Sequence, residues 1–433
     1  MGLAAYISVP PRGTSEVQEH LTRSSPPDHT TERSESREKS LLYRIVHPSL
    51  SRPSSRFSQD VVRLTEEVYG TDTQTVLETL LKPVTTYYVR CNTLKTSPDE
   101  LMRTLAEKGL QVALHPAIPE ALGIRVEGPF DISPTGKQVV VDKHAAESIL
   151  QGANVYAPGI TSCESVHFGD AVTVVSEIGD VLATGRSKMS TDEILKFRKG
   201  LAISVMKRRY HAPQIRDLPE YSQGLLYPQS LAAMAASRTL DPQPGDTILD
   251  MNCAPGGKLS HISQLMHNTG RIVGLDRNGE KITTTRRNVV ALGCSNATVS
   301  IHDSRYADVD FADLKPDRVM VDPPCSALGL RPKVYDLTTQ QRVIALAKYQ
   351  KQFLKAASRL VKPDGVIVYS VCTYTTDECE GAVQYATEEC GLHLIEQTPL
   401  LASKNANKVL SLCQRFHPVL DEIGYFIAKF ERD

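Results

Sequence analysis

Two cysteines follow stretches that read as buried strands, and both carry side chains that could take part in covalent chemistry. Cys325 comes after Asp322 and two prolines, and Cys372 comes after the strand-like residues 365–370. A thiolate can add to an electron-poor carbon of a substrate. Free cysteine is also among the most buried residue types, so packing inside a sheet explains either residue taken alone. Whether the two thiols do chemistry therefore depends on the groups around them.

A glycine turn at residues 250–258 indicates a ligand site. A predicted strand at 247–250 leads into the turn, and a predicted helix at 259–267 follows it. Glycines let the backbone approach a ligand closely and present amides at a helix N-terminus. The Gly-x-Gly-x-x-Gly motif and the phosphate-binding loop are both absent. The predicted cofactor contacts in this turn are Asn252, Cys253, Ala254, Pro255, Gly256, Gly257 and Lys258.

Carboxylates at the ends of successive strands favour a cationic cofactor. Asp250, Asp276, Asp303 and Asp322 occupy these positions. Asp276 is placed to accept hydrogen bonds from ribose hydroxyls, as an acidic residue does in dinucleotide folds, and Asp303 is within reach of an adenine edge. So many carboxylates would repel nucleotide phosphates, whereas S-adenosylmethionine carries a sulfonium and an ammonium. The sequence therefore predicts S-adenosylmethionine, with Asp276, Asp303 and Asp322 among its contacts.

The elements that must position these residues alternate between strands and helices. Strands are predicted at residues 247–250, 271–276, 297–301, 318–322 and 365–370. This alternation is typical of a parallel, doubly wound α/β sheet of the Rossmann type. Ligands bind such sheets beyond the carboxyl ends of the strands. The aspartates and both cysteines are thus expected to line one crevice.

Four segments are predicted along the chain. Residues 1–55 are rich in Ser, Pro and mixed charges, which predicts a disordered tail. Residues 56–135 combine helical periodicity with a strand, which predicts an α/β module packed on the core. Residues 136–214 contain short strands and predict a small β-rich domain, and residues 215–433 hold the catalytic sheet.

Basic residues are dense near the end of the β-rich domain. Lysines and arginines outnumber acids between residues 186 and 209, and a solvated charged face would explain this bias. The alternative is a surface that contacts RNA phosphates, made in part by Lys207, Arg208 and Arg209. Because the net charge is −1, any nucleic-acid site must be a local patch.

The composition excludes several protein classes. The 433 residues are 41% hydrophobic and 23% charged, which is a globular balance rather than a collagenous, wholly disordered or membrane-embedded one. Nine scattered cysteines without a Cys-x-x-Cys pair predict neither a disulfide framework nor a metal site. No apolar run approaches the roughly 20 residues of a spanning helix. The first residues lack a secretory pattern, so a cytoplasmic protein is expected.

The two cysteine motifs resemble those of the Nop/Sun RNA 5-methylcytosine methyltransferases. The likeness covers most of residues 57–433 and extends to members with a PUA (pseudouridine synthase and archaeosine transglycosylase) domain, which residues 138–213 resemble. The ending at 423–430 resembles the C-terminal strand of these members. Three positions depart from the family pattern: Asn252 replaces Cys or Ala, Ala327 replaces Gly, and Val371 replaces Thr.

The resemblance implies a cytosine-C5 methyltransferase in which the two thiols have different roles. Cys372 is implied to be the nucleophile that adds to carbon 6, and Cys325 to assist product release. Asp322 is placed to hydrogen-bond the N3 and N4 edge of the base. DNA cytosine methyltransferases use the cysteine of a Pro-Cys motif instead, so the reverse assignment, with Cys372 structural, stays open.

The resemblance also implies an RNA substrate and its contacts. The implied substrate is the tRNA acceptor stem with its CCA end, and messenger RNA is a second candidate. Arg90 and Asn92, in a segment shared with the family, and Lys258 are predicted to help hold RNA. No protein partner is indicated, so a monomer is expected. Two rival functions are a catalytically weak RNA-binding scaffold and an enzyme that methylates the adenine amino group, which typically needs an aromatic residue where Cys325 stands.

Overall fold

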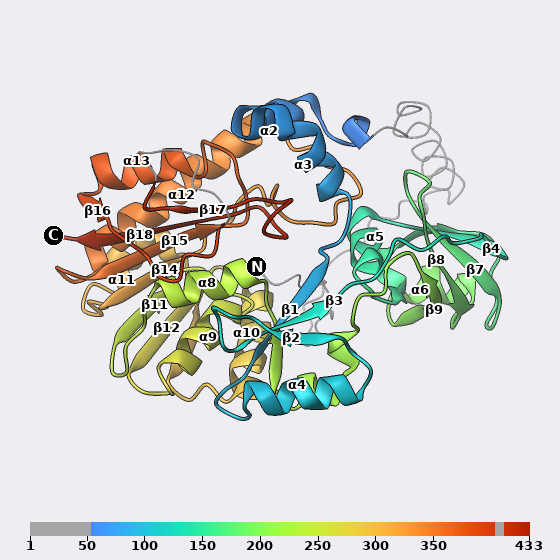
Figure 1. Cartoon of the computed structure of the whole chain (residues 1–433), viewed down its shortest axis with the longest axis horizontal. Coiled ribbons are helices and arrows are strands. Elements are labelled where there is room, and N and C mark those ends of the chain that lie inside the picture. Colours follow the sequence, from blue (N-terminus) through green and yellow to red (C-terminus); the bar gives the residue numbers. More distant parts are fainter. Residues whose placement is uncertain (1–52, 403–410) are drawn as a thin grey trace, which may run out of the picture.

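Three β-sheets organise the computed structural model, which describes residues 53–402 and 411–433 (Figure 1). The predicted tail at 1–55 lies outside the described residues except for its last three. Those three already belong to a short 3-10 helix, η1 (Pro53–Arg56). Within the described ranges, no helix is both long and apolar enough to cross a bilayer.

The largest sheet has eight strands and carries the site. Its order is β13-β12-β11-β14-β15-β18-β16, with β17 paired to β18. The five predicted strands are present and parallel: β11 (Thr247–Asp250), β12 (Arg271–Asp276), β13 (Ala297–Ile301), β14 (Arg318–Val321) and β15 (Val366–Val371). The sheet is mixed, because three further strands join these five: β18 (Tyr425–Arg432) pairs antiparallel with β15, and β16 (Leu392–Leu394) and β17 (Gln414–Phe416) pair antiparallel with β18.

Helices cover both faces of this sheet, which confirms the doubly wound prediction (Figure 1). One face packs on α8 (Leu231–Thr239), α9 (Gly257–Leu265) and α10 (Gly279–Leu292), and the other on α11 (Ala307–Asp310), α12 (Gln340–Leu360) and α13 (Glu380–Glu389). A 3-10 turn, η5 (Ser304–Tyr306), precedes α11.

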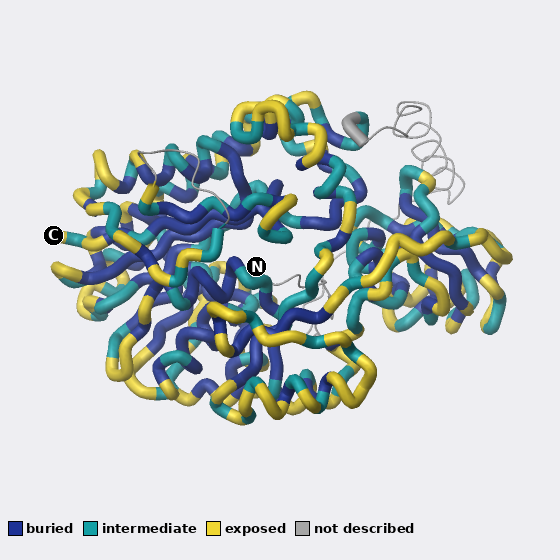
Figure 2. The backbone as a smooth tube through the Cα atoms, viewed as in Figure 1, coloured by how far each residue is buried: buried dark blue, intermediate teal, exposed yellow. Residues whose placement is uncertain are grey.

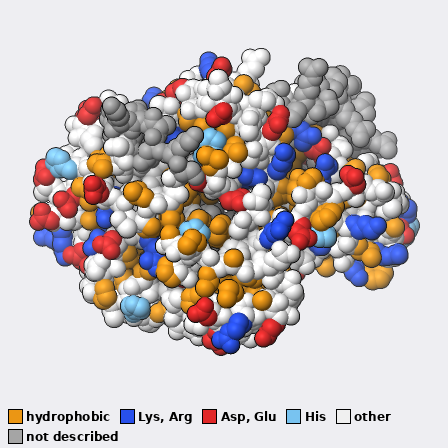
Figure 3. Space-filling view, viewed as in Figure 1, with side chains coloured by type: hydrophobic (Ala, Val, Ile, Leu, Met, Phe, Trp, Pro, Cys, Tyr) orange, Lys and Arg blue, Asp and Glu red, His pale blue; other side chains and the backbone are white. Residues whose placement is uncertain are grey.

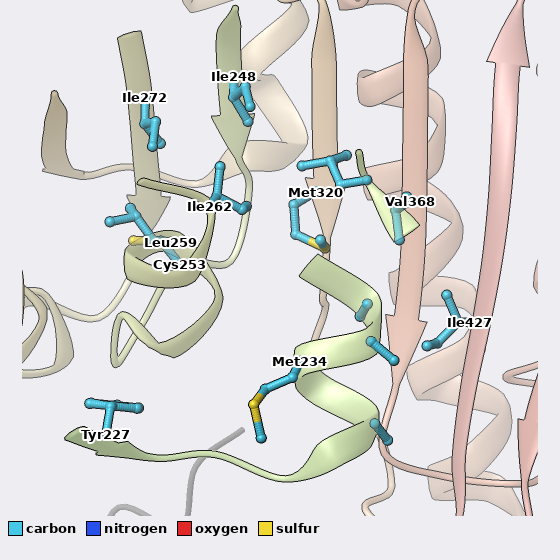
Figure 4. Close-up of a cluster of buried hydrophobic side chains, with 14 of the residues drawn as sticks. Tyr227, Met234, Ile248, Cys253, Leu259, Ile262, Ile272, Met320, Val368 and Ile427 are labelled. Carbon is cyan, nitrogen blue, oxygen red and sulfur yellow. The ribbon is translucent and has the colours of Figure 1, made fainter. Parts of the chain in front are cut away.

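Each central strand serves both faces, because successive side chains point to opposite sides of a sheet. Ile248 belongs to the first cluster and Leu249 to the second. In Figure 4, Met320 and Val368 point from neighbouring strands toward the helix that carries Met234. The strands are buried along their length, as the dark blue tube in Figure 2 shows. Their apolar residues on both faces hold the strand ends in register.

The N-terminal module contains a four-stranded sheet in the order β10-β1-β3-β2. Its strands are β1 (Thr86–Cys91), β2 (Val112–Leu114), β3 (Ala121–Arg125) and β10 (Leu226–Pro228), with the helices α4 (Pro98–Glu107), η4 (Ile215–Asp217) and α7 (Pro219–Ser222). Strand β10 comes from the segment predicted to be catalytic, so the chain returns to complete this sheet. The preceding helices α2 (Gln59–Tyr69), η2 (Gly70–Asp72) and α3 (Thr73–Leu80) pack on Leu328, Val343 and Tyr374.

The β-rich domain forms a six-stranded sheet in the order β5-β9-β8-β7-β4-β6. Its strands are β4 (Lys137–Val141), β5 (Val155–Tyr156), β6 (Ile160–Cys163), β7 (Ala171–Ser176), β8 (Val181–Ser187) and β9 (Leu201–Arg208). Its helices are α5 (Lys143–Leu150), η3 (Ala157–Gly159) and α6 (Thr191–Phe197). This domain is the lobe on the right in Figure 1.

A segment after Cys325 connects the catalytic sheet to the β-rich domain. Val334 is 2% exposed and packs within the hydrophobic cluster of that domain. Its backbone N–H donates to Glu147 of α5 at 3.1 Å. Lys333 donates from Nζ to the carbonyl of Ala327 at 3.0 Å. The loop that carries Cys325 is therefore attached to the neighbouring domain.

Candidate active site

The two cysteines meet because β14 and β15 are adjacent strands. The loops after these strands bring the Sγ atoms of Cys325 and Cys372 to 3.3 Å from each other. Cys372 is 2% exposed, and Cys325 is partly exposed. The residues predicted to react thus lie in one site.

The contact between the sulfurs makes the two thiols unequal. The hydrogen bond with Cys325 lowers the pKa of Cys372; burial and Asp322 oppose this effect, and Lys258 assists it. The same hydrogen bond and burial, with a smaller contribution from Glu378, raise the pKa of Cys325. A thiol that donates to its neighbour keeps its proton. Either sulfur can donate in this contact; when Cys325 donates, Cys372 is left as the sulfur that ionises first.

A buried ion pair stands beside the thiols. Lys258 Nζ lies 2.6 Å from Asp322 Oδ2, and the two side chains are 7% and 12% exposed. Burial would raise the pKa of Asp322, but the Lys258 ammonium outweighs it and keeps that pKa below its usual value. Ser370 donates to the other carboxylate oxygen at 3.4 Å, and the Tyr425 ring lies 5.7 Å from Lys258 Nζ. Lys258, which was predicted to help hold RNA, thus lies inside the protein beside the crevice and not on its surface.

A pocket adjoins this ion pair on the side of the glycine turn. It is lined by Asp322, by the predicted turn residues except Gly256, and by Tyr227, Gln229 and Ala233. Gly256 has φ +103°, a conformation that glycine adopts without strain. A Cβ on Gly257 would lie 3.1 Å from the Tyr227 ring. The turn residues predicted from the sequence therefore do form a cavity wall.

Three buried polar atoms around the turn have no partner within the described residues. They are Gln229 Nε2, Asp250 Oδ2 and Asn252 Oδ1. A buried polar atom without a partner costs roughly 1–3 kcal/mol, so these atoms suit a ligand with hydrogen-bonding groups. The two oxygens match an ammonium, and the Gln229 amide matches a carboxylate. An amino acid end such as that of S-adenosylmethionine fits this set.

Asp250 is the most perturbed carboxyl group near the turn. Burial, followed by the charge of Asp322, raises the pKa of Asp250 to about 7, although Lys258 opposes the shift. A cationic group of a ligand placed beside Asp250 would lower this pKa again.

Asp276 and Asp303 lie at the ends of the adjacent strands β12 and β13, as the sequence predicts. Asp276 accepts a hydrogen bond from the Asn278 backbone at 2.9 Å and is partly exposed. Asp303 accepts a hydrogen bond from Arg305 at 2.5 Å, and this contact lowers its pKa. The Arg305 guanidinium also lies 4.9 Å from the centre of the Tyr349 ring. Two carboxylates and a ring are thus available for a nucleoside.

Three family descriptions match successive parts of the chain. They are the RsmF/B-like ferredoxin-like domain at residues 61–133, the PUA domain at 137–208 and the 16S rRNA methyltransferase RsmB/F at 237–431. The tRNA (cytosine(72)-C(5))-methyltransferase of Pyrococcus horikoshii is 36% identical, over 82% of this chain and 92% of its own length. The tRNA (cytosine(72)-C(5))-methyltransferase NSUN6 of Homo sapiens is 30% identical, over 82% of this chain and 90% of its own.

The chain belongs to the RNA cytosine-C5 methyltransferase family. The crystal structure of NSun6 from Pyrococcus horikoshii with SFG, an analogue of S-adenosylmethionine, matches with a TM-score of 0.80 and 34% identity. The match covers 87% of this chain and 98% of that one. The predictions of the fold and of S-adenosylmethionine as the cofactor are therefore confirmed. Among the described residues of this methyltransferase, no group of three or more His, Cys, Asp or Glu is arranged to hold a metal ion.

Arg90 and Asn92 do not lie where RNA could contact them, so this prediction was wrong. Their side chains are 1% and 2% exposed. Arg90 donates to Gln229 Oε1 and to the Gly257 carbonyl at 2.6 Å each, and to Ser260 Oγ at 2.8 Å. Asn92 donates to two main-chain carbonyls. Both residues attach the N-terminal module to the catalytic domain, and Arg90 supports the glycine turn from inside the protein.

The basic residues of the PUA domain are better placed for RNA. Lys207 and Arg209 are exposed near the end of β9, whereas Arg208 is half-buried and donates to Asn154 Oδ1 at 3.2 Å. Figure 3 shows Lys and Arg side chains, with acidic ones between them, on the lobe that this domain forms. Lys207 and Arg209 stay candidates for phosphate contact.

Several residues of the site carry no signal in the sequence that marks them as functional. Gln229 precedes the N-cap of α8, and no local pattern indicates that its side chain lines the pocket. Asp250 was placed at a strand end but was given no role. Glu378 follows Cys372 by six residues, and two of its partners, Ser326 and Gln350, lie far away in the sequence.

Proposed function

We propose that this methyltransferase acts on carbon 5 of a cytosine in the tRNA acceptor stem, through a covalent bond between Cys372 and carbon 6 of the base. The 3.3 Å contact between the two sulfurs is the observation that supports it most strongly. Two thiols in contact, one buried and one partly exposed, lie next to a largely buried carboxylate, and this arrangement suits addition and elimination at a pyrimidine.

Each residue of the site has a distinct task in this proposal. Carbon 5 is a weak nucleophile, so the Cys372 thiolate first adds to carbon 6 and makes the ring an enamine. Asp322 accepts a hydrogen bond from the amino group of the base and holds its edge. S-adenosylmethionine, when bound, supplies a methyl group on a sulfonium. A water molecule takes the proton from the methylated carbon 5, the electron pair of that C–H bond re-forms the carbon 5–carbon 6 double bond, and the carbon 6–sulfur bond breaks. The Cys325 thiol stabilises the departing Cys372 thiolate by a hydrogen bond.

The cofactor is held, in this proposal, by the glycine turn and the strand-end carboxylates. Asp250, Asn252 and Gln229 contact its amino acid end through the three buried atoms that have no partner among the described residues. Asp276 accepts from the ribose hydroxyls, and Asp303 lies at the adenine edge. Lys258 donates a hydrogen bond to Asp322 and so orients the carboxylate that contacts the base, without contacting the base itself.

The substrate assignment is supported by the relatives and by the PUA domain. Relatives that align over most of the chain carry the name tRNA (cytosine(72)-C(5))-methyltransferase. A base near the end of a stem costs little to unstack, which a buried site requires. We propose that the PUA domain holds the CCA end, with Lys207 and Arg209 on phosphates, that messenger RNA is a secondary substrate, and that the protein acts as a cytoplasmic monomer.

One assay tests the proposal and its rivals together. Total tRNA is incubated with methyl-labelled cofactor, and the modified nucleoside and its position are identified by mass spectrometry and bisulfite sequencing. We expect 5-methylcytidine in the acceptor stem, and a large loss of it when the 3′ CCA is removed. RNA binding without label at saturating cofactor would instead show a scaffold, and methylated adenosine would show an amino-methylating enzyme. Cys372→Ala should abolish the label, because Cys372 is the proposed nucleophile. Cys390→Ala, which alters a partly exposed cysteine outside the site, is the control and should keep it.

A further inference from the structure

A buried glutamate connects the loops that carry Cys325 and Cys372. Glu378 is 0% exposed, and its carboxylate accepts four hydrogen bonds. We propose that Glu378 is a positioning residue for methyl transfer, which keeps the two sulfurs in contact and keeps Cys325 as the partner that carries the proton. The inference rests on the proposed covalent route.

On the Cys325 side, Glu378 holds the residues that flank the thiol. The backbone N–H of Ser326 donates to Oε1 at 2.8 Å, and its hydroxyl donates to Oε2 at 2.5 Å. Gln350 of α12 donates to Oε1 at 2.9 Å and also to the Pro324 carbonyl at 3.0 Å. Of the two neighbours of Cys325, Ser326 is therefore hydrogen-bonded to the Glu378 carboxylate, and Pro324 is hydrogen-bonded to Gln350, which itself contacts that carboxylate.

On the Cys372 side, the same carboxylate holds the loop that follows the thiol. Thr375 donates from its hydroxyl to Oε2 at 2.9 Å. The Ser326 hydroxyl also lies 2.7 Å from the Thr373 hydroxyl, next to Cys372. Tyr369 of β15 donates to the Glu378 carbonyl at 2.7 Å. Because these bonds cross between the loops, they oppose any change that would separate the sulfurs.

The charge of Glu378 acts in the same direction as its hydrogen bonds. Among the residues that the structure describes, the charged groups that influence the thiol pair are Lys258, Asp322 and Glu378. After the hydrogen bond to Cys372 and burial, Glu378 adds to the rise in the pKa of Cys325. A negative charge near Cys325 favours its protonated form. The shared proton thus stays on Cys325, and Cys372 is left as the thiolate.

Thiol alkylation in the Glu378→Gln variant tests this role. The glutamine side chain has nearly the same shape as glutamate, but its NH₂ group cannot accept the hydrogen bonds that Ser326, Gln350 and Thr375 donate to the carboxylate. Full-length protein without RNA or cofactor is treated with iodoacetamide from pH 6 to 10, and each cysteine is followed by mass spectrometry. In the wild type, Cys372 should react at a lower pH than Cys325. In the variant, we expect this gap to narrow by about one pH unit.

Steady-state kinetics provide the second measurement. We expect kcat of Glu378→Gln to fall at least about tenfold, while KM for tRNA changes by less than about twofold, because the effect is on the chemical step. An unchanged alkylation gap together with an unchanged kcat would overturn the proposal. Glu220→Gln, at a buried glutamate paired with Lys108 at 2.7 Å elsewhere, should leave both measurements unaltered.

A milder variant decides the matter if Glu378→Gln fails to fold. Ser326→Ala keeps the carboxylate and its charge but removes the hydroxyl that contacts Glu378 and Thr373. We expect kcat to fall about threefold, while the pH difference between the alkylation of Cys372 and that of Cys325 stays as in the wild type. A wild-type kcat would show that these hydrogen bonds do not position the thiols. Because alkylation needs no substrate, a shifted gap in a protein that does not methylate RNA would count against the proposed function and not against Glu378.

Discussion

Removing Lys258 should destabilise the protein more than removing any exposed lysine. Lys258→Met removes the ammonium that pairs with Asp322, whose side chain is 12% exposed. The Asp322 carboxylate also lies close enough to Asp250 to raise the pKa of Asp250. Loss of one partner from a buried ion pair costs about 3–5 kcal/mol, because the ammonium no longer offsets the cost of removing the carboxylate from water. For a domain of roughly 200 residues, this corresponds to a fall of about 6–20 °C in Tm.

The assay is urea unfolding followed by circular dichroism, since the chain has no tryptophan to report by fluorescence. The control is Lys362→Met, because Lys362 and Asp317 form a pair whose side chains are 43% and 33% exposed. That change should cost about 0–1 kcal/mol. The double variant Lys258→Met with Asp322→Asn should recover most of the stability, since no charge is then left buried. A loss below about 1 kcal/mol, or a double variant no more stable than the single one, would refute the reasoning.

Three further variants follow from the same structure. With its pKa raised to about 7, Asp250 keeps a proton in the folded state that the unfolded chain loses above pH about 4, so stability falls as pH rises from about 4 to 7. Asp250→Asn should remove this slope in unfolding free energies measured at pH 5 and 8; an equal slope in both proteins would contradict the assignment. Ala327 has φ +57°, a conformation that glycine adopts with less strain than alanine. Ala327→Gly should therefore raise the free energy of unfolding by about 0.5–1 kcal/mol and raise Tm in thermal unfolding, and a lower Tm would contradict this prediction. Arg90→Lys should lower Tm, because it removes buried hydrogen bonds, and should leave the salt dependence of tRNA binding unchanged. If Arg90 contacted a phosphate instead, the slope of log K against log salt concentration would fall by about 1 in magnitude.

Much of the fold was predictable because the strands of a sheet covered on both faces must be apolar on both sides. Residues 248 and 249 serve opposite clusters, and such runs, bounded by turns, can be read directly. The antiparallel position of β18 could not be read in this way. Its apolar residues suit a parallel or an antiparallel neighbour equally, and only its pairing with β15 decides the direction.

The site was predictable where chemistry is concentrated in short motifs. Cys325, Asp322 and the glycine turn stand directly at strand ends, so their meeting follows from the topology. Arg90 shows the opposite case, because an arginine on a strand has the same local pattern whether it faces RNA or the interior. Glu378 was missed because its partners Ser326 and Gln350 lie 52 and 28 positions away, and only the folded chain brings them together.

The unequal roles of the two thiols are tested most directly by trapping the covalent complex. Cys325→Ala and Cys372→Ala variants are incubated with tRNA and S-adenosylmethionine and separated on a denaturing gel. If Cys372 attacks and Cys325 assists release, Cys325→Ala should accumulate a protein–RNA adduct and Cys372→Ala should form none. An adduct in Cys372→Ala and none in Cys325→Ala would show that the roles are exchanged.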